Sequence, residues 1–150
     1  MQSEQSPFHT LLFRAFHAQR SYLHSCLGES GLGAGQPKLL VYLNDHGPCS
    51  QRELADYFEI DPAAVSRMLC AMEKGGFVAR QTNQASRRSD LISLTEKGRQ
   101  FAKLWLEHYR EIEEIMLHGF TPQEREQFSQ YLLRAYQNYR VWKEGQQCGI

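Results

Sequence analysis

The chain has 150 residues, of which 41% are hydrophobic and 23% are charged, values typical of a single soluble domain. Its 17 basic residues equal its 17 acidic ones, which weighs against a nucleic-acid-binding protein because phosphate affinity comes mostly from clustered lysine and arginine. The four cysteines form no C-x-x-C pair, and no apolar run reaches membrane-spanning length. We therefore expect no zinc ribbon, disulfide scaffold or membrane partner, and a cytoplasmic location.

The N-terminal part of the sequence predicts two helices separated by a glycine-rich break. Apolar residues recur at helical spacing from Phe8 to Leu27. Glycines between residues 28 and 35 interrupt this pattern. Pro37 suits the first turn of a second helix, which ends at His46 and Gly47.

Two short helices joined by a tight turn come next. Ser50 and Glu53 have the spacing of a capping box, in which the hydroxyl and the carboxylate each bind an unpaired backbone N–H group. Asp61 and Pro62 are suited to begin the following helix as its N-cap and its first residue. Glycines 75 and 76 end that helix. The arrangement is typical of a helix-turn-helix.

A β-hairpin follows the helix-turn-helix directly and predicts a wing. Segments 77–80 and 91–94 have the character of strands, and the polar loop between them contains Arg87 and Arg88. Thr95 is placed to cap the next helix, which we expect to be long.

Two helices complete the chain. The first keeps an apolar stripe as far as His118, before Gly119. Thr121 and Glu124 form a second capping box, which opens a last helix whose apolar stripe ends at Trp142. We expect the chain to fray from Gly145.

These elements predict a mainly α fold with a small β-hairpin wing. The fold class is a winged helix-turn-helix with N- and C-terminal dimerisation helices. We expect the winged module at residues 36–98 and the helical dimerisation region at residues 7–30 and 99–143, in a single intertwined domain. The apolar stripes of the terminal helices need a further partner, and a two-fold axis would let two copies cover each other.

Three segments of the sequence resemble the MarR family of transcriptional regulators. Segment 50–55 reads SQRELA, segment 65–80 contains VSR and MEKGGFVAR, and segment 87–98 reads RRSDLISLTEKG. Their order and spacing resemble the family's helix-turn-helix and wing signatures over nearly the whole chain. The resemblance implies a homodimer that binds an operator in double-stranded DNA, with a small aromatic acid or phenol as effector. The family's wing aspartate corresponds to Ser86 here, so the resemblance implies a wing arginine that is less firmly held.

Residues 62–90 carry five basic residues against two acidic ones, so the basic excess is local. A helix that enters the major groove must present small or polar side chains near its N-terminus. Alanine can touch a thymine methyl group, and arginine can bind the edge of guanine. Arginines at a wing tip suit the minor groove or phosphates. The candidate DNA contacts are Pro62, Ala63, Ala64, Ser66, Arg67 and Cys70 on the recognition helix, Ser86, Arg87 and Arg88 on the wing, and Ser50 and Gln51 at the backbone.

The resemblance implies an effector pocket between the terminal helices, which are rich in aromatic residues, and the winged module; its candidate residues are Arg14, His17, Tyr42 and Trp105. Aromatic stripes at helical spacing also fit a plain core. The six histidines include no pair at i, i+4 spacing, so we expect no metal site and no cofactor. Cys26 and Cys70 are candidates for redox sensing, although a small packed residue is the simpler interpretation of each.

The sequence therefore predicts a homodimeric, sequence-specific DNA-binding regulator, most simply a repressor, that binds a palindromic operator and is released by a small aromatic ligand. One alternative is a winged helix used for protein–protein assembly, which the zero net charge favours. Another is a cysteine-based, redox-responsive regulator. No nucleophile elbow, phosphate-binding glycine loop or H-E-x-x-H motif is present, so we expect no enzymatic activity.

Overall fold

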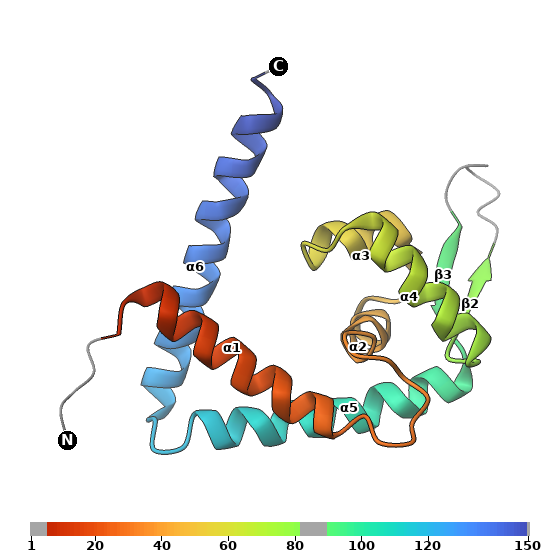
Figure 1. Ribbon diagram of the computed structural model, residues 1–150, viewed down its shortest axis with the longest axis horizontal. Coiled ribbons are helices and arrows are strands. Elements are labelled where there is room, and N and C mark those ends of the chain that lie inside the picture. The colour runs from red at the N-terminus through yellow and green to blue at the C-terminus, as the bar shows by residue number, and fades with distance from the viewer. Residues whose placement is uncertain (1–5, 82–89, 150) are drawn as a thin grey trace. The chain divides into compact units, whose positions relative to one another are not determined.

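The computed structural model describes residues 6–81 and 90–149 (Figure 1). These residues form mainly helices, with one small sheet. The elements in chain order are α1 (Phe8–Ser25), α2 (Pro37–His46), β1 (Cys49–Ser50), α3 (Gln51–Tyr57), α4 (Pro62–Lys74), β2 (Val78–Gln81), β3 (Leu91–Leu94), α5 (Glu96–Met116) and α6 (Pro122–Gln147).

The predicted helix starts are confirmed by their hydrogen bonds. Ser50 Oγ accepts from the Glu53 N–H at 3.1 Å, and the Glu53 carboxylate accepts from the Ser50 N–H at 3.2 Å. Thr121 and Glu124 form the same reciprocal pair at 3.2 and 2.8 Å. Asp61 Oδ2 accepts from the Ala64 N–H at 3.2 Å. Each cap satisfies backbone donors that the first turn of a helix leaves without partners.

The sheet is antiparallel, with strand order β1-β3-β2. On the central strand β3, Ile92 lies opposite Cys49 of β1 and Arg80 of β2. The hairpin of β2 and β3 was predicted, but β1 was not. A strand of two residues is too short to show alternating polarity, and only its pairing with a distant segment defines it.

The core of the winged module joins α2, α3, α4, the hairpin and α5. The apolar stripes of α2, α3 and α4 and one face of the sheet meet here with the first half of α5, so residues 36–98 close this core together with a part of α5 that lies beyond residue 98. The prediction of a mainly α winged helix-turn-helix is confirmed. The largest fully buried side chains are Leu39, Leu40, Leu54, Val65, Leu69, Met72, Phe77, Ile92 and Trp105.

The chain divides into two compact units, and the boundary falls within α5, between Ile112 and Glu113. In the first unit, α1 lies alongside α5 (Figure 1), where the Tyr22 hydroxyl contacts Glu111. In the second unit, Arg125 binds the Glu114 carboxylate with two nitrogens, at 2.6 and 3.0 Å.

Helix α6 continues to Gln147, so the expected fraying from Gly145 was wrong. The Cys148 N–H still bonds to the Glu144 carbonyl at 3.3 Å. The end of the apolar stripe, at Trp142, marks only where the helix face that can pack against a partner ends. The backbone of a formed helix propagates past that point because each added residue gains one hydrogen bond.

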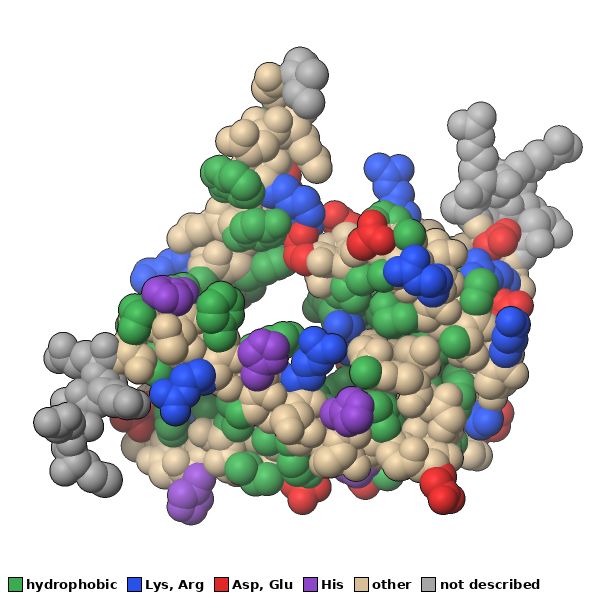
Figure 2. All heavy atoms as spheres, in the orientation of Figure 1, with side chains coloured by type: hydrophobic (Ala, Val, Ile, Leu, Met, Phe, Trp, Pro, Cys, Tyr) green, Lys and Arg blue, Asp and Glu red, His purple; other side chains and the backbone are tan. Residues whose placement is uncertain are grey.

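None of the residues that the structure describes in α1 or α6 is buried. Large apolar side chains on both helices are instead open to solvent, as the green side chains along α6 show in Figure 2. Over residues 6–81 and 90–149, no helix combines the length and the apolarity that a bilayer span requires. The exposed apolar residues include Phe8, Leu11, Phe13 and Phe16 on α1 and Phe128, Leu132, Tyr136, Tyr139 and Trp142 on α6.

Candidate nucleic-acid interface

Helix α4 has one buried face and one open face. Val65, Leu69 and Met72 are fully buried at spacings of three and four residues, which the 3.6-residue period of a helix places on one side. Five of the six candidate recognition residues lie away from that side, whereas Pro62, three residues before Val65, is accessible because it is the first residue of the helix. Pro62, Ala63, Arg67 and Cys70 are exposed, and Ala64 and Ser66 are partly exposed. The structure thus brings them onto one accessible surface, which we call the α4 face.

The N-terminus of α3 supplies the two candidate backbone contacts. Ser50 is partly buried, and its hydroxyl is engaged as the helix cap. Gln51 is the first residue of α3, and its Oε1 accepts from Arg80 Nη1 at 3.5 Å. Figure 2 shows lysine and arginine side chains gathered over the region of α3 and α4, with acidic side chains among them.

The candidate wing residues Ser86, Arg87 and Arg88 lie outside the described residues. The stem of the wing is described. Its strands pair from Val78 opposite Leu94 to Gln81 opposite Leu91.

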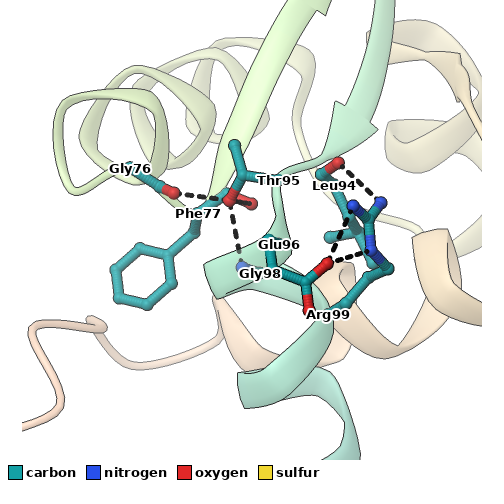
Figure 3. A network of polar contacts seen from close by, with 7 residues as sticks. All are labelled: Gly76, Phe77, Leu94, Thr95, Glu96, Gly98 and Arg99. Atoms are coloured by element: carbon teal, nitrogen blue, oxygen red, sulfur yellow. Dashed lines mark hydrogen bonds and ion pairs between the residues drawn. The ribbon is translucent and has the colours of Figure 1, made fainter.

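A hydrogen-bonded joint fastens the wing and the end of α4 to the start of α5 (Figure 3). Thr95 Oγ1 donates to the Gly76 carbonyl at 2.6 Å and accepts from the Gly98 N–H at 3.0 Å, so the predicted cap is confirmed. Lys97 Nζ donates to the Gly75 carbonyl at 2.8 Å and lies 4.4 Å from the centre of the Phe77 ring. The end of α4 therefore cannot shift without disturbing α5.

Gly98 has a steric reason to be glycine. A Cβ atom at this position would lie 2.0 Å from the Phe77 carbonyl oxygen, far inside van der Waals contact. The first turn of α5 can therefore approach the wing closely only without a side chain here.

A cavity of about 450 Å³ lies in the first unit, between α1, α2, α4 and α5. Its walls combine aromatic rings, Trp105 and Tyr109 among them, with the basic side chains of Arg20 and Lys38. Burial, and secondarily the nearby Arg20, lowers the pKa of Lys38. Burial also raises the pKa of Tyr109 to about 12. An anion would relieve the repulsion between the two cations, so the cavity suits a small aromatic anion.

The four candidate pocket residues are placed differently. Trp105 lines this cavity. Tyr42 lines a second cavity of about 230 Å³, together with Tyr57 and Phe58. Arg14 and His17 lie on the exposed surface of α1 and are not among the lining residues of either cavity.

The cysteines occupy different environments. Cys26 is partly buried and Cys70 is exposed on the α4 face. Cys49 is buried, and this burial raises the pKa of its thiol to about 11. Among the described residues, no three histidine, cysteine, aspartate or glutamate side chains come together as a metal site.

Sequence reasoning missed two residues with clear contacts at this interface. Arg80 binds Glu73 at 3.0 Å as well as Gln51, and Lys97 binds the end of α4. A signal was available for Arg80, since an acid and a base stand seven residues apart across a glycine turn. The contact of Lys97 with a backbone carbonyl leaves no trace in sequence spacing.

Comparison with known proteins agrees with this arrangement. The MarR family matches residues 32–89. An HTH-type transcriptional repressor of Mycobacterium bovis, Mb2911, is 30% identical over 125 residues, which cover 83% of this chain and 90% of that protein.

Two solved structures have the same fold over most of their length. A MarR-family regulator of Listeria monocytogenes in complex with a 26mer DNA has a TM-score of 0.85 and 25% identity, covering 89% of each chain. The Bordetella bronchiseptica regulator BpsR, whose DNA binding is regulated by 6-hydroxynicotinic acid, has a TM-score of 0.74 and 28% identity, covering 86% of this chain and 97% of BpsR. This chain therefore belongs to the MarR family of non-enzymatic, DNA-binding transcriptional regulators.

Proposed function

We propose that the protein is a homodimeric repressor that binds an inverted-repeat operator and leaves it when a small aromatic anion binds. The observation that carries the proposal is the α4 face, where small residues and Arg67 stand exposed on the helix that a winged helix places in the major groove. The relative in Mycobacterium bovis is named a repressor, which supports the same role here.

The exposed apolar faces of α1 and α6 support a homodimer. Side chains such as Phe8 and Trp142 are 71% and 58% exposed, and apolar surface of this extent marks an interface. A two-fold axis would pair these faces with their copies and give the dimer two α4 faces. Two recognition helices about one helical turn of DNA apart match an inverted repeat.

The cavity supports a link between effector and DNA. Met68 of α4 and Trp105 of α5 both line it, so an occupant would contact the recognition helix directly. A ligand that binds best when the two α4 helices are spaced wrongly for DNA shifts the population away from the DNA-bound form. Regulation of BpsR by an aromatic carboxylic acid is consistent with an anionic effector.

Selection of bound fragments from random DNA, repeated at two salt concentrations, tests the DNA-binding part of the proposal. We expect enrichment of an inverted repeat and binding that weakens as salt rises, because bound arginine and lysine release counterions from phosphates. A folded dimer that enriches no sequence would instead favour a winged helix used in protein assembly.

The recovered repeat then allows a test of Arg67. Arg67→Ala should weaken operator binding by about tenfold to a hundredfold, the range for one lost arginine contact to guanine. Arg110→Ala on α5 is the matched control, because it removes the same charge away from the α4 face. Equal losses in both variants would indicate a general charge effect.

For the effector, 6-hydroxynicotinic acid is the first probe, followed by other small aromatic acids. We expect a titration to lower operator affinity in the wild type and to have a weaker effect on Lys38→Met, which removes one cavity cation. An unchanged response in the variant would place the effector elsewhere.

A further inference from the structure

Arg80 of β2 connects three elements of the candidate DNA interface. Its Nε donates to Glu73 Oε2 on α4 at 3.0 Å. Its Nη1 donates to Gln51 Oε1 on α3 at 3.5 Å, and its Nη2 lies 3.9 Å from Cys70 Sγ on α4. All three guanidinium nitrogens therefore face side chains of the two helices of the helix-turn-helix.

The chemistry of a guanidinium suits this bridging role. Its donors are held in one rigid plane, so three partners bound at once are fixed relative to one another. The side chains of Arg80 and Glu73 are 29% and 46% exposed. A pair this exposed contributes little to the free energy of unfolding. Its larger effect is on geometry, because it sets the position of the first residue of α3 against the open side of α4.

The same contacts make Arg80 poorly suited to bind DNA itself. A bound carboxylate compensates its charge, and that carboxylate would repel an approaching phosphate. Arg80 also stands on the stem of the hairpin, opposite Ile92, where the pairing of β2 with β3 fixes its backbone. Arg80 is thus fixed on β2 by strand pairing, and its side chain holds α3 and α4.

We propose that Arg80 is a positioning residue of the DNA interface, which holds the N-terminus of α3 and the recognition helix in the register that an operator requires. The inference rests on the proposed function, since it assigns a role in reading DNA. It goes beyond that function by placing a determinant of specificity in a residue that makes no contact with DNA.

Glu73→Met separates the positioning role from direct binding of DNA by Arg80, because the two predict opposite results. If Arg80 bound phosphate, removal of Glu73 would leave the charge of Arg80 uncompensated and tighten operator binding. The slope of log affinity against log salt concentration would steepen by about one. If Arg80 positions the helices, Glu73→Met should weaken operator binding by about tenfold, the effect of one lost contact, despite the more positive charge.

Arg80→Lys provides the complementary test. Lysine keeps the charge and could still reach a phosphate, but a single ammonium cannot bridge Gln51, Glu73 and Cys70 in a fixed plane. The positioning role predicts a loss of about tenfold for this variant too. Asp45→Asn is the matched control for Glu73→Met, because it removes an exposed negative charge on α2, outside the Arg80 contacts.

The experiment measures anisotropy of two labelled duplexes, one with the inverted repeat from the selection and one with the same bases scrambled. The full-length variants are compared at several salt concentrations after their melting temperatures are matched to the wild type. We expect Glu73→Met and Arg80→Lys to lose preference for the repeat, with an unchanged salt slope and affinity for the scrambled duplex. Hydrogen exchange at residues 50–53 should accelerate in both variants.

Two results would overturn the inference. Tighter or unchanged binding by Glu73→Met, or wild-type binding by Arg80→Lys, would exclude the positioning role while leaving the proposed function intact. A wild type that prefers no repeat over the scrambled duplex would remove the proposed function itself, and with it any role of Arg80 in reading DNA.

Discussion

The winged module and helix α6 both carry apolar residues at helical spacing, but only the module buries them. In the module, leucines such as Leu39, Leu54 and Leu69 are completely buried. In α6, Leu132 and Leu133 repeat at positions that a helix could bury, yet they are 48% and 46% exposed. The module thus contains completely buried leucines, whereas none of the residues that the structure describes in α6 is buried.

Apolar periodicity therefore identifies a helix face that needs covering but not the partner that covers it. Inside the module, the faces of neighbouring elements are complementary and joined by short connections, so one chain suffices. A long helix with a broad exposed aromatic face requires a second surface of comparable length. The proposed dimer supplies one, and the substitutions below test whether the two regions depend on protein concentration differently.

The largest effect is expected from Gly98→Ala, which adds a side-chain atom where α5 approaches the wing most closely. The new Cβ atom would lie 2.0 Å from the Phe77 carbonyl oxygen, and backbone cannot yield as a flexible side chain does. We expect a loss of roughly 4 kcal/mol or more in the free energy of unfolding, or failure to fold. Urea denaturation measures it. Gly145→Ala in α6 is the control, since nothing lies within 4 Å of its Cβ position, and it should stabilise the helix slightly.

Leu69→Ala should lower the free energy of unfolding by about 3 kcal/mol, because it leaves a cavity in the core of the module. Its effect should be the same at any protein concentration, since the core is complete within one chain. Leu104→Ala on α5 is the matched control, at a position that is 44% exposed. Comparable losses in the two variants would mean that Leu104 is covered in the assembled protein.

Leu132→Asp tests whether the exposed apolar face of α6 forms the dimer interface. A charge placed in an apolar interface is left without a partner, so we expect the dissociation constant of the dimer to rise by about tenfold or more. Sedimentation velocity over a concentration series measures this shift. Gln137→Asp adds the same charge to an exposed position of α6. If both variants dimerise like the wild type, the interface does not include Leu132.

The smallest effect concerns the bond between Glu114 and Arg125 within the second unit. The hydrogen bonds from Arg125, and then its charge, lower the pKa of Glu114. The contribution to stability is therefore complete above the ordinary pKa of a glutamate, about 4.3, and is lost as the pH falls through the lower folded value. Glu114→Gln should reduce the melting temperature slightly at neutral pH and leave it unchanged in strong acid. A reduction that persists in acid would contradict this ionic origin.

Much of the fold could be predicted because its signals are local. The capping boxes at Ser50 and Thr121 need only residues three positions apart, and the proline after Asp61 needs only its neighbour. The strands of the hairpin and the two faces of α4 also follow from spacing, since side-chain direction in a helix or strand is periodic. The candidate recognition residues were found in this way, as the positions left over when Val65 and Leu69 turn inward.

The order of the helices and of the two hairpin strands, and the outward side of α4, therefore followed from local patterns in the sequence. Features that require contacts between residues far apart in the sequence could be seen only in the tertiary structure. Strand β1 is defined only by the pairing of Cys49 with Ile92. Trp105 lines the cavity and Arg14 does not, which depends on how the helices pack against one another. The role of Arg80 likewise became visible only when its three nitrogens were seen to meet α3 and α4. The reason is physical: hydrogen bonding and packing at short range act within a helical turn, whereas contacts across the fold depend on the placement of every element between them.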